Sequence, residues 1–177
     1  MMMTPTTFEP KIIKNACSKT YLDMFMHFIP QVELWDDEQI AEEDYDKINL
    51  TKLNLIEHGH YKNPLLAGIA IGLMSQIYDA GGKDYFTPEM HFCGLSVKDK
   101  STKVNLHTDN WDENKLKVLG ILNSDWKKTY GGGFEHGGVL HSPEPGDFII
   151  FDPRVPHRAQ DILTDKKRIA IDWTLKL

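Results

Sequence analysis

The second half of this chain consists of short apolar runs that Gly, Pro, Asn and Asp interrupt at close intervals. Runs this short, bounded by turn residues, predict strands rather than helices. The expected strands cover residues 91–98, 103–107, 116–122, 134–140, 147–151 and 168–175, with turns at 98–101, 110–114, 131–133 and 143–146. Closely spaced short strands indicate a β-sandwich or barrel.

The first half has a different texture. Apolar residues at three- and four-residue spacings predict a helix over 18–29, with Ser18 as its N-cap and Pro30 at its end. A second apolar segment predicts a helix over 65–78 that Gly81-Gly82 closes. Residues 31–35 are consistent with a short strand, and the acidic stretch 36–44 with a solvated face. We therefore expect residues 1–85 to be a mostly helical support for a β-rich half, 86–177.

Length and charge limit the function classes. A chain of 177 residues with 41% apolar residues fits a single domain, 1–177. The net charge of −6 disfavours bulk binding of nucleic acid. Only Cys17 and Cys93 occur, without a CxxC pair, which fits a reducing compartment. Without a signal-peptide pattern or an apolar run of about 20 residues, we expect a cytoplasmic protein with no membrane association.

Two histidines and one aspartate form the pattern that carries chemistry. His107 and Asp109 end a predicted strand, where residues i and i+2 project to the same face. His157 follows in a proline-rich segment and can fold back beside them. Two imidazoles and one carboxylate occupy one face of an octahedron and leave three positions open, as in non-haem iron(II) oxygenases. His107, Asp109 and His157 are therefore the predicted metal ligands.

Arg168 opens the last predicted strand, eleven residues after His157. A guanidinium group is always charged and forks onto a carboxylate through two parallel hydrogen bonds. A dicarboxylate that chelates iron at one end would need such an anchor at the other.

The order of these motifs resembles the 2-oxoglutarate- and iron(II)-dependent oxygenases, and most closely their prolyl 4-hydroxylase branch, which includes the oxygen-sensing prolyl hydroxylases. The matching stretches lie within 91–177: 107–110 (HTDN), 121–126 (ILNSDW), 132–133 (GG), 145–151 (PGDFIIF), 155–157 (VPH) and 168–173 (RIAIDW). Residues 1–85 carry no such resemblance.

The resemblance implies a double-stranded β-helix (jelly-roll) core buttressed by helices. It implies that His107, Asp109 and His157 ligate Fe(II), and that Arg168 binds the 5-carboxylate of 2-oxoglutarate, with ascorbate as reductant in vitro. Oxygen-sensing members place a tyrosine about ten residues before HxD, whereas this chain has none at 95–98. Asn105, two residues before His107, is the proposed substitute in cosubstrate binding.

Several interpretations remain open. The first hypothesis is hydroxylation of a peptidyl residue such as proline, and the runner-up is a free amino acid or another small metabolite. Nucleic-acid dealkylation and a non-catalytic jelly-roll metal-binding module are further alternatives. A lone histidine is more often a surface or core residue, so we interpret His58 and His60 as solvent-facing. His136 and His141 are interpreted as part of a surface strand, with the mouth of a substrate site as the alternative. Loops at 79–90 and 108–116 are expected to set selectivity, and Trp111 is either a substrate contact or a core or turn residue.

Overall fold

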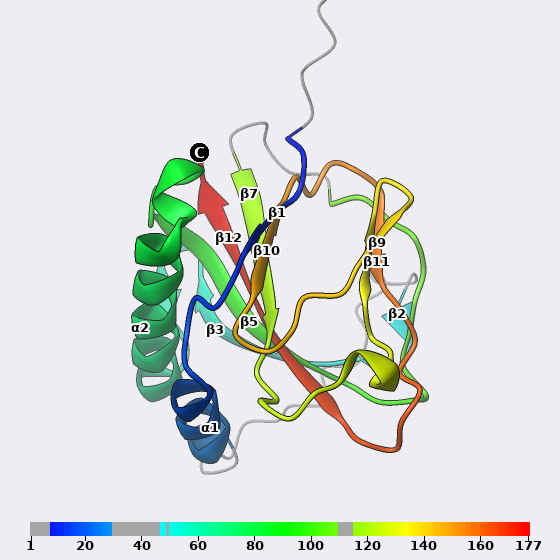
Figure 1. The fold of residues 1–177 in the computed structure, drawn as a ribbon. Helices are drawn as coiled ribbons and strands as arrows, with labels where there is room; N and C mark the ends of the chain where they lie inside the picture. Colours follow the sequence, from blue (N-terminus) through cyan, green and yellow to red (C-terminus); the bar gives the residue numbers. More distant parts are fainter. Residues whose placement is uncertain (1–7, 30–46, 49, 110–114) are drawn as a thin grey trace, which may run out of the picture.

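The computed structural model describes residues 8–29, 47–48, 50–109 and 115–177, and its largest element is an antiparallel sheet of seven strands (Figure 1). Its strand order is β1 (Lys11–Ile13), β10 (Phe148–Phe151), β7 (Lys115–Ile121), β12 (Arg168–Lys176), β5 (Met90–Lys98), β3 (Thr51–Glu57) and β4 (His60–Tyr61). β12 lies at the centre, paired with β7 on one side and β5 on the other.

Smaller sheets face this main sheet (Figure 1). β11 (His157–Ala159), β8 (Phe134–His136) and β9 (Val139–His141) form one, and β2 (Lys47–Ile48) pairs with β6 (Lys103–Val104). An antiparallel bridge between His107 and His157 joins the segment after β6 to β11. The result is mostly β with a few helices and antiparallel sheets, which is consistent with the expected jelly-roll.

Capping residues mark the beginning of two helices. α1 (Lys19–Phe28) begins after Ser18, whose hydroxyl accepts a hydrogen bond from the Tyr21 N–H at 3.1 Å. α2 (Pro64–Ala80) begins after Asn63, which accepts from the Leu66 N–H at 3.0 Å, and Gly81 ends it. Both predicted helices are confirmed. The described residues also form short 3-10 turns, η3 (Gly82–Asp84) and η4 (Lys128–Tyr130). No described helix is long and apolar enough to cross a membrane.

The alternation of side chains along β12 separates the core from the site. Ile171, Trp173 and Leu175 belong to one buried cluster with residues of α1 and α2, which lie on that side of the sheet (Figure 1). Arg168 and Asp172 line cavities on the opposite side, between the sheets. The core therefore anchors the strands whose other face forms the site.

The first half contributes more than helices. β3 pairs with β5 and β1 with β10, so the expectation that 1–85 is a mostly helical support is incomplete. Leu53 and Leu55 are buried while Lys52 and Asn54 are partly exposed, which is the two-residue period of a half-buried strand. The segments 31–35 and 36–44 lie outside the described residues.

The predicted strand over 134–140 is in fact a hairpin. β8 and β9 pair through a turn at Gly137 and Gly138, whose φ values of 56° and 79° favour glycine. Gly131–133 were expected to form a hairpin turn, but they connect η4 to β8, and Gly131 bridges to Ile162. That expectation was wrong, because the hairpin turn lies at Gly137 and Gly138, after the three residues of β8.

Candidate active site

Three predicted ligands come together where the sheets face each other. The His107 N–H donates to the His157 carbonyl at 3.1 Å, and the His157 N–H donates to the His107 carbonyl at 2.8 Å. This reciprocal pairing sets the two imidazole rings 4.6 Å apart between centroids. The Asp109 N–H donates to the Pro153 carbonyl at 2.9 Å. The backbone thus fixes all three residues before any ligand binds.

The donor atoms lie within reach of one metal ion. Asp109 Oδ2 is 3.5 Å from His157 Nε2, and Asp109 Oδ1 is 3.9 Å from His107 Nε2. Among the described residues, only this cluster has three potential ligand atoms, all within 4.8 Å of one another. Neutral nitrogen and carboxylate oxygen donors in a two-histidine, one-carboxylate set suit ferrous iron.

Backbone carbonyls orient both imidazoles. His107 Nδ1 lies 2.8 Å from the Asn105 carbonyl, and His157 Nδ1 lies 2.8 Å from the Val155 carbonyl. A carbonyl only accepts, so each Nδ1 carries a proton and each Nε2 is the ring nitrogen turned toward Asp109. Hydrogen bonding of the second ring nitrogen is the usual support of a metal-binding histidine. The set therefore fits a metal ion.

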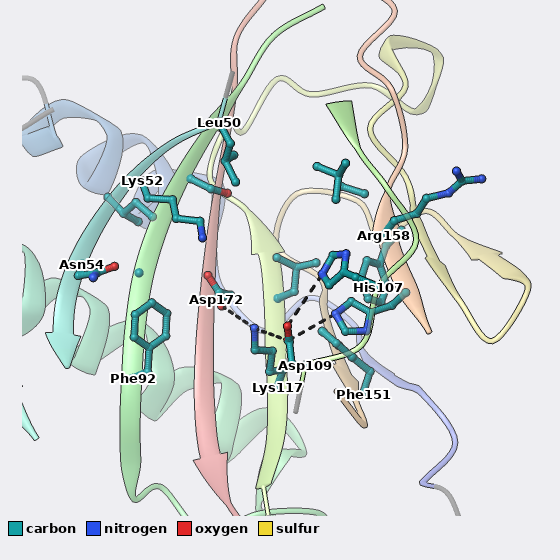
Figure 2. Close-up of a pocket in the computed structure, with 18 of the residues that line it drawn as sticks. Leu50, Lys52, Asn54, Phe92, His107, Asp109, Lys117, Phe151, Arg158 and Asp172 are labelled. Carbon is teal, nitrogen blue, oxygen red and sulfur yellow. Dashed lines mark ion pairs between the residues drawn. The ribbon is translucent and has the colours of Figure 1, made fainter. Parts of the chain in front are cut away.

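A lysine and an aspartate complete the polar centre (Figure 2), and neither was among the residues predicted from the sequence. Lys117 Nζ lies 2.8 Å from Asp109 Oδ2 and 3.7 Å from Asp172 Oδ2. Burial alone would raise the pKa of Asp109, but His157 and Lys117 hold it well below its usual range. Burial likewise lowers the pKa of Lys117, but Asp172 and Asp109 more than offset this effect. A single aspartate within the apolar run 169–175 was the available signal for Asp172.

A cavity of about 510 Å³ opens over this centre. The three predicted ligands, Lys117 and Asp172 line it together with Leu119, Phe134 and Ala159. The last three also line a smaller apolar pocket that ends at Arg168. The metal-ligand cluster and the arginine are therefore linked through a shared apolar wall.

Arg168 is buried and incompletely bonded. Its side chain is 3% exposed, its Nη1 donates to the Gly132 carbonyl, and its Nε has no hydrogen-bond partner. Burial lowers the pKa of Arg168 to about 10, so it stays charged at neutral pH. No other charged side chain lines the smaller pocket among the described residues. An unsatisfied guanidinium in an apolar pocket fits the distal carboxylate of 2-oxoglutarate.

Asn105 does not take the place predicted for it. Its side chain is exposed and does not line the cavity, and its backbone carbonyl instead contacts His107. The prediction assumed that the strand alternation continues to His107, but β6 ends at Val104. Within the described part of the chain, Arg168 therefore has no second polar side chain beside it in the smaller pocket.

His136 also departs from its interpretation as a surface residue. It is 4% exposed and stacks on His157, with 6.4 Å between ring centroids. Its Nε2 lies 3.0 Å from the Asp152 carbonyl. His136 thus packs behind a predicted ligand. Trp111 lies outside the described residues.

Comparisons with known proteins identify the fold. The sequence matches no protein-family model, and no curated protein matches it. Solved structures do match over nearly the whole chain. A prolyl-4-hydroxylase from Pseudomonas putida is 15% identical with a TM-score of 0.63, covering 97% of this chain and 94% of its own. The chain has the fold of the 2-oxoglutarate- and iron(II)-dependent oxygenases.

Two further structures support this oxygenase fold. An oxidoreductase of the 2OG-Fe(II) oxygenase family from Burkholderia pseudomallei is 14% identical, with a TM-score of 0.71 and coverage of 94% and 85%. A Trichoplax adhaerens prolyl hydroxylase, solved with a peptide fragment of the hypoxia inducible factor oxygen degradation domain, is 18% identical, with a TM-score of 0.65 and coverage of 94% and 83%. The resemblance predicted from residues 91–177 is thus confirmed at the level of the fold, and it extends into the first half of the chain.

Proposed function

We propose that this protein is an Fe(II)- and 2-oxoglutarate-dependent dioxygenase that hydroxylates a C–H bond and releases succinate and CO2. The observation that carries the proposal is the combination of His107, Asp109 and His157 with an unsatisfied Arg168 across a shared apolar wall. A metal-binding module without catalysis would have no use for a buried guanidinium at that position, because burying an unpaired charge costs stability.

Each residue has a defined task in this proposal. His107, Asp109 and His157 hold the metal, and Arg168 binds and orients the 5-carboxylate of 2-oxoglutarate. When bound, iron and 2-oxoglutarate together supply the oxidising chemistry that activates dioxygen and hydroxylates the substrate. Leu119, Phe134 and Ala159 line both cavities, and their apolar side chains would limit the access of water to the space between the metal ligands and Arg168.

For the substrate, we propose a peptidyl residue such as proline. The cavity of about 510 Å³ extends over β3 and β5, where Lys52, Asn54 and Phe92 line it (Figure 2). Ser96 of β5 lines it as well. An extended peptide fits a floor made of two neighbouring strands. The structurally similar Trichoplax protein, which was solved with a peptide, supports this choice.

A free amino acid or another small metabolite is the second candidate. Lys117 and Asp172 place one positive and one negative group on the cavity wall beside the predicted ligands. Such a wall suits a small polar molecule better than an apolar ring.

The test is succinate formation in the presence of Fe(II), 2-oxoglutarate and ascorbate. The wild-type protein should form succinate, and the His107→Ala variant should form none. A peptide library and a set of free amino acids are then compared for a mass gain of one oxygen atom. Succinate formation that persists in His107→Ala would refute the assignment of the metal site.

A further inference from the structure

Lys117, on a strand of the main sheet, directly contacts the predicted metal ligand Asp109. It lies on β7, and Asp172 lies on the adjacent β12, where the register pairs Asp172 with Leu119 and Thr174 with Lys117. Asp172 and Lys117 therefore project to the same face, one step apart along the strands. Their side chains are 25% and 16% exposed, and both border the cavity (Figure 2).

We propose that Lys117, held by Asp172, restricts Asp109 to a single metal-binding oxygen and so keeps one metal position open. This inference rests on the proposed function. Carboxylates bind metal ions through one oxygen or through both. Two histidines and one carboxylate leave three positions free only when the carboxylate uses a single oxygen. Chelating 2-oxoglutarate and admitting dioxygen together require all three.

The distances assign the two oxygens of Asp109. Lys117 Nζ lies 2.8 Å from Oδ2, so that oxygen already has a cationic partner. A metal ion approaching Oδ2 would displace this contact and meet the repulsion of the ammonium group. Among the described residues, Oδ1 has no such cationic partner and lies 3.9 Å from His107 Nε2, whereas Oδ2 also lies 3.5 Å from His157 Nε2. Lys117 therefore leaves Oδ1 as the oxygen for the metal.

Asp172 holds the ammonium group of Lys117 in place from the other side. Its Oδ2 lies 3.7 Å from Lys117 Nζ, on the side opposite to Asp109 (Figure 2). A flexible lysine side chain with only one partner could follow Asp109 as it turns. Between two carboxylates it is fixed, since both attract the same ammonium group. Lys117 is thus a positioning residue, and Asp172 sets its place.

The test counts the metal-bound water molecules by water-proton relaxation of the Mn²⁺-loaded protein. The paramagnetic relaxation scales with the number of coordinated waters, of which the wild type should have three. In Lys117→Met, Asp109 becomes free to bind through both oxygens, and the relaxation should fall by about a third. The same variant should bind Mn²⁺ several-fold more tightly, because a positive charge is removed and an oxygen ligand is added. Lys117→Arg should keep the wild-type relaxation.

Lys176→Met is the matched control. Lys176 forms a 2.6 Å ion pair with Glu89, and both side chains are exposed, so its removal should change neither quantity. Because Lys117→Met leaves Asp109 and Asp172 without their shared cation, the double variant Lys117→Met/Asp172→Asn is measured as well. It keeps the charge balance of the centre and should show the same loss of about a third.

Two results would overturn the proposal. One is wild-type relaxation in Mn²⁺-loaded Lys117→Met and in the double variant. The other is weaker Mn²⁺ binding in both, which would indicate a merely structural lysine. Either result leaves the proposed function intact if the wild type still converts 2-oxoglutarate. A wild type that binds no Mn²⁺ would instead contradict both the proposed function and this inference.

Discussion

Replacing Arg168 by methionine should stabilise the ligand-free protein while weakening its binding of 2-oxoglutarate. Burial lowers the pKa of Arg168 from its usual range to about 10. Since each pKa unit corresponds to about 1.4 kcal/mol, keeping this guanidinium charged in the fold costs roughly 3 kcal/mol. The cost applies at all pH values below about 10, because the folded-state pKa of this base is the lower one.

Methionine removes that cost and also removes the hydrogen bond to the Gly132 carbonyl. A hydrogen bond from a charged group is worth about 1.5 kcal/mol, so the net gain is about 1.5 kcal/mol. For a chain of this size, that gain corresponds to a rise in Tm of about 3–6 °C. The affinity for 2-oxoglutarate, in contrast, should fall. Losing a charge-assisted contact of about 1.5–3 kcal/mol should weaken 2-oxoglutarate binding roughly 10- to 150-fold.

Differential scanning calorimetry of the ligand-free protein and titration calorimetry of the Mn²⁺-loaded protein measure the two effects. Lys167→Met is the control, because the neighbouring Lys167 is exposed and should alter neither value. A lower Tm in Arg168→Met would contradict the stability argument. Unchanged 2-oxoglutarate affinity would remove Arg168 from the cosubstrate site.

Three further substitutions test the surroundings of the site. A Cβ at Gly132 (φ +71°) would meet Ile162 and Arg168, whereas a Cβ at Gly138 (φ +79°) would meet nothing within 4 Å. In chemical denaturation, Gly132→Ala should therefore lower the free energy of unfolding by about 1–3 kcal/mol more than Gly138→Ala does. Burial raises the pKa of Asp152, but its contacts with Arg154 lower the pKa overall. Arg154→Met should therefore lower the free energy of unfolding by about 2 kcal/mol at pH 7. This difference from wild type should shrink as the pH falls below about 4, where the Asp152 carboxylate is progressively protonated. An equal difference at pH 3 and pH 7 would contradict the Arg154 prediction. Asn105→Ala should leave 2-oxoglutarate affinity in calorimetry unchanged, because only the backbone carbonyl of Asn105 reaches the site.

Local signals in the sequence were sufficient for α1, α2, most strands of the second half and the three predicted ligands. Ser18 and its apolar spacing located α1, and the apolar run 168–175 located β12. HxD at a strand end, with a distant histidine, predicted three side chains that the structure brings together. These signals depend on neighbouring residues along the chain, so they can be recognised without knowledge of the tertiary structure.

The remaining features depend on which strands become neighbours. Lys117 looks like a solvent-facing lysine in the sequence, and it contacts Asp109 only because β7 faces the HxD segment across the cavity. Asn105 was misplaced because the strand period stops at Val104. The burial of His136 follows from the short hairpin at Gly137, which no periodicity predicted. Pairing and hairpin geometry decided each of these cases.

Metal-dependent binding of 2-oxoglutarate tests the central claim most directly, because it needs no knowledge of the substrate. Titration calorimetry with Mn²⁺ in place of iron should show one 2-oxoglutarate per chain in the wild type. Without metal, or in Asp109→Ala, the binding should be lost. Binding of equal strength with and without metal, or no binding to the metal-loaded wild type, would contradict the account.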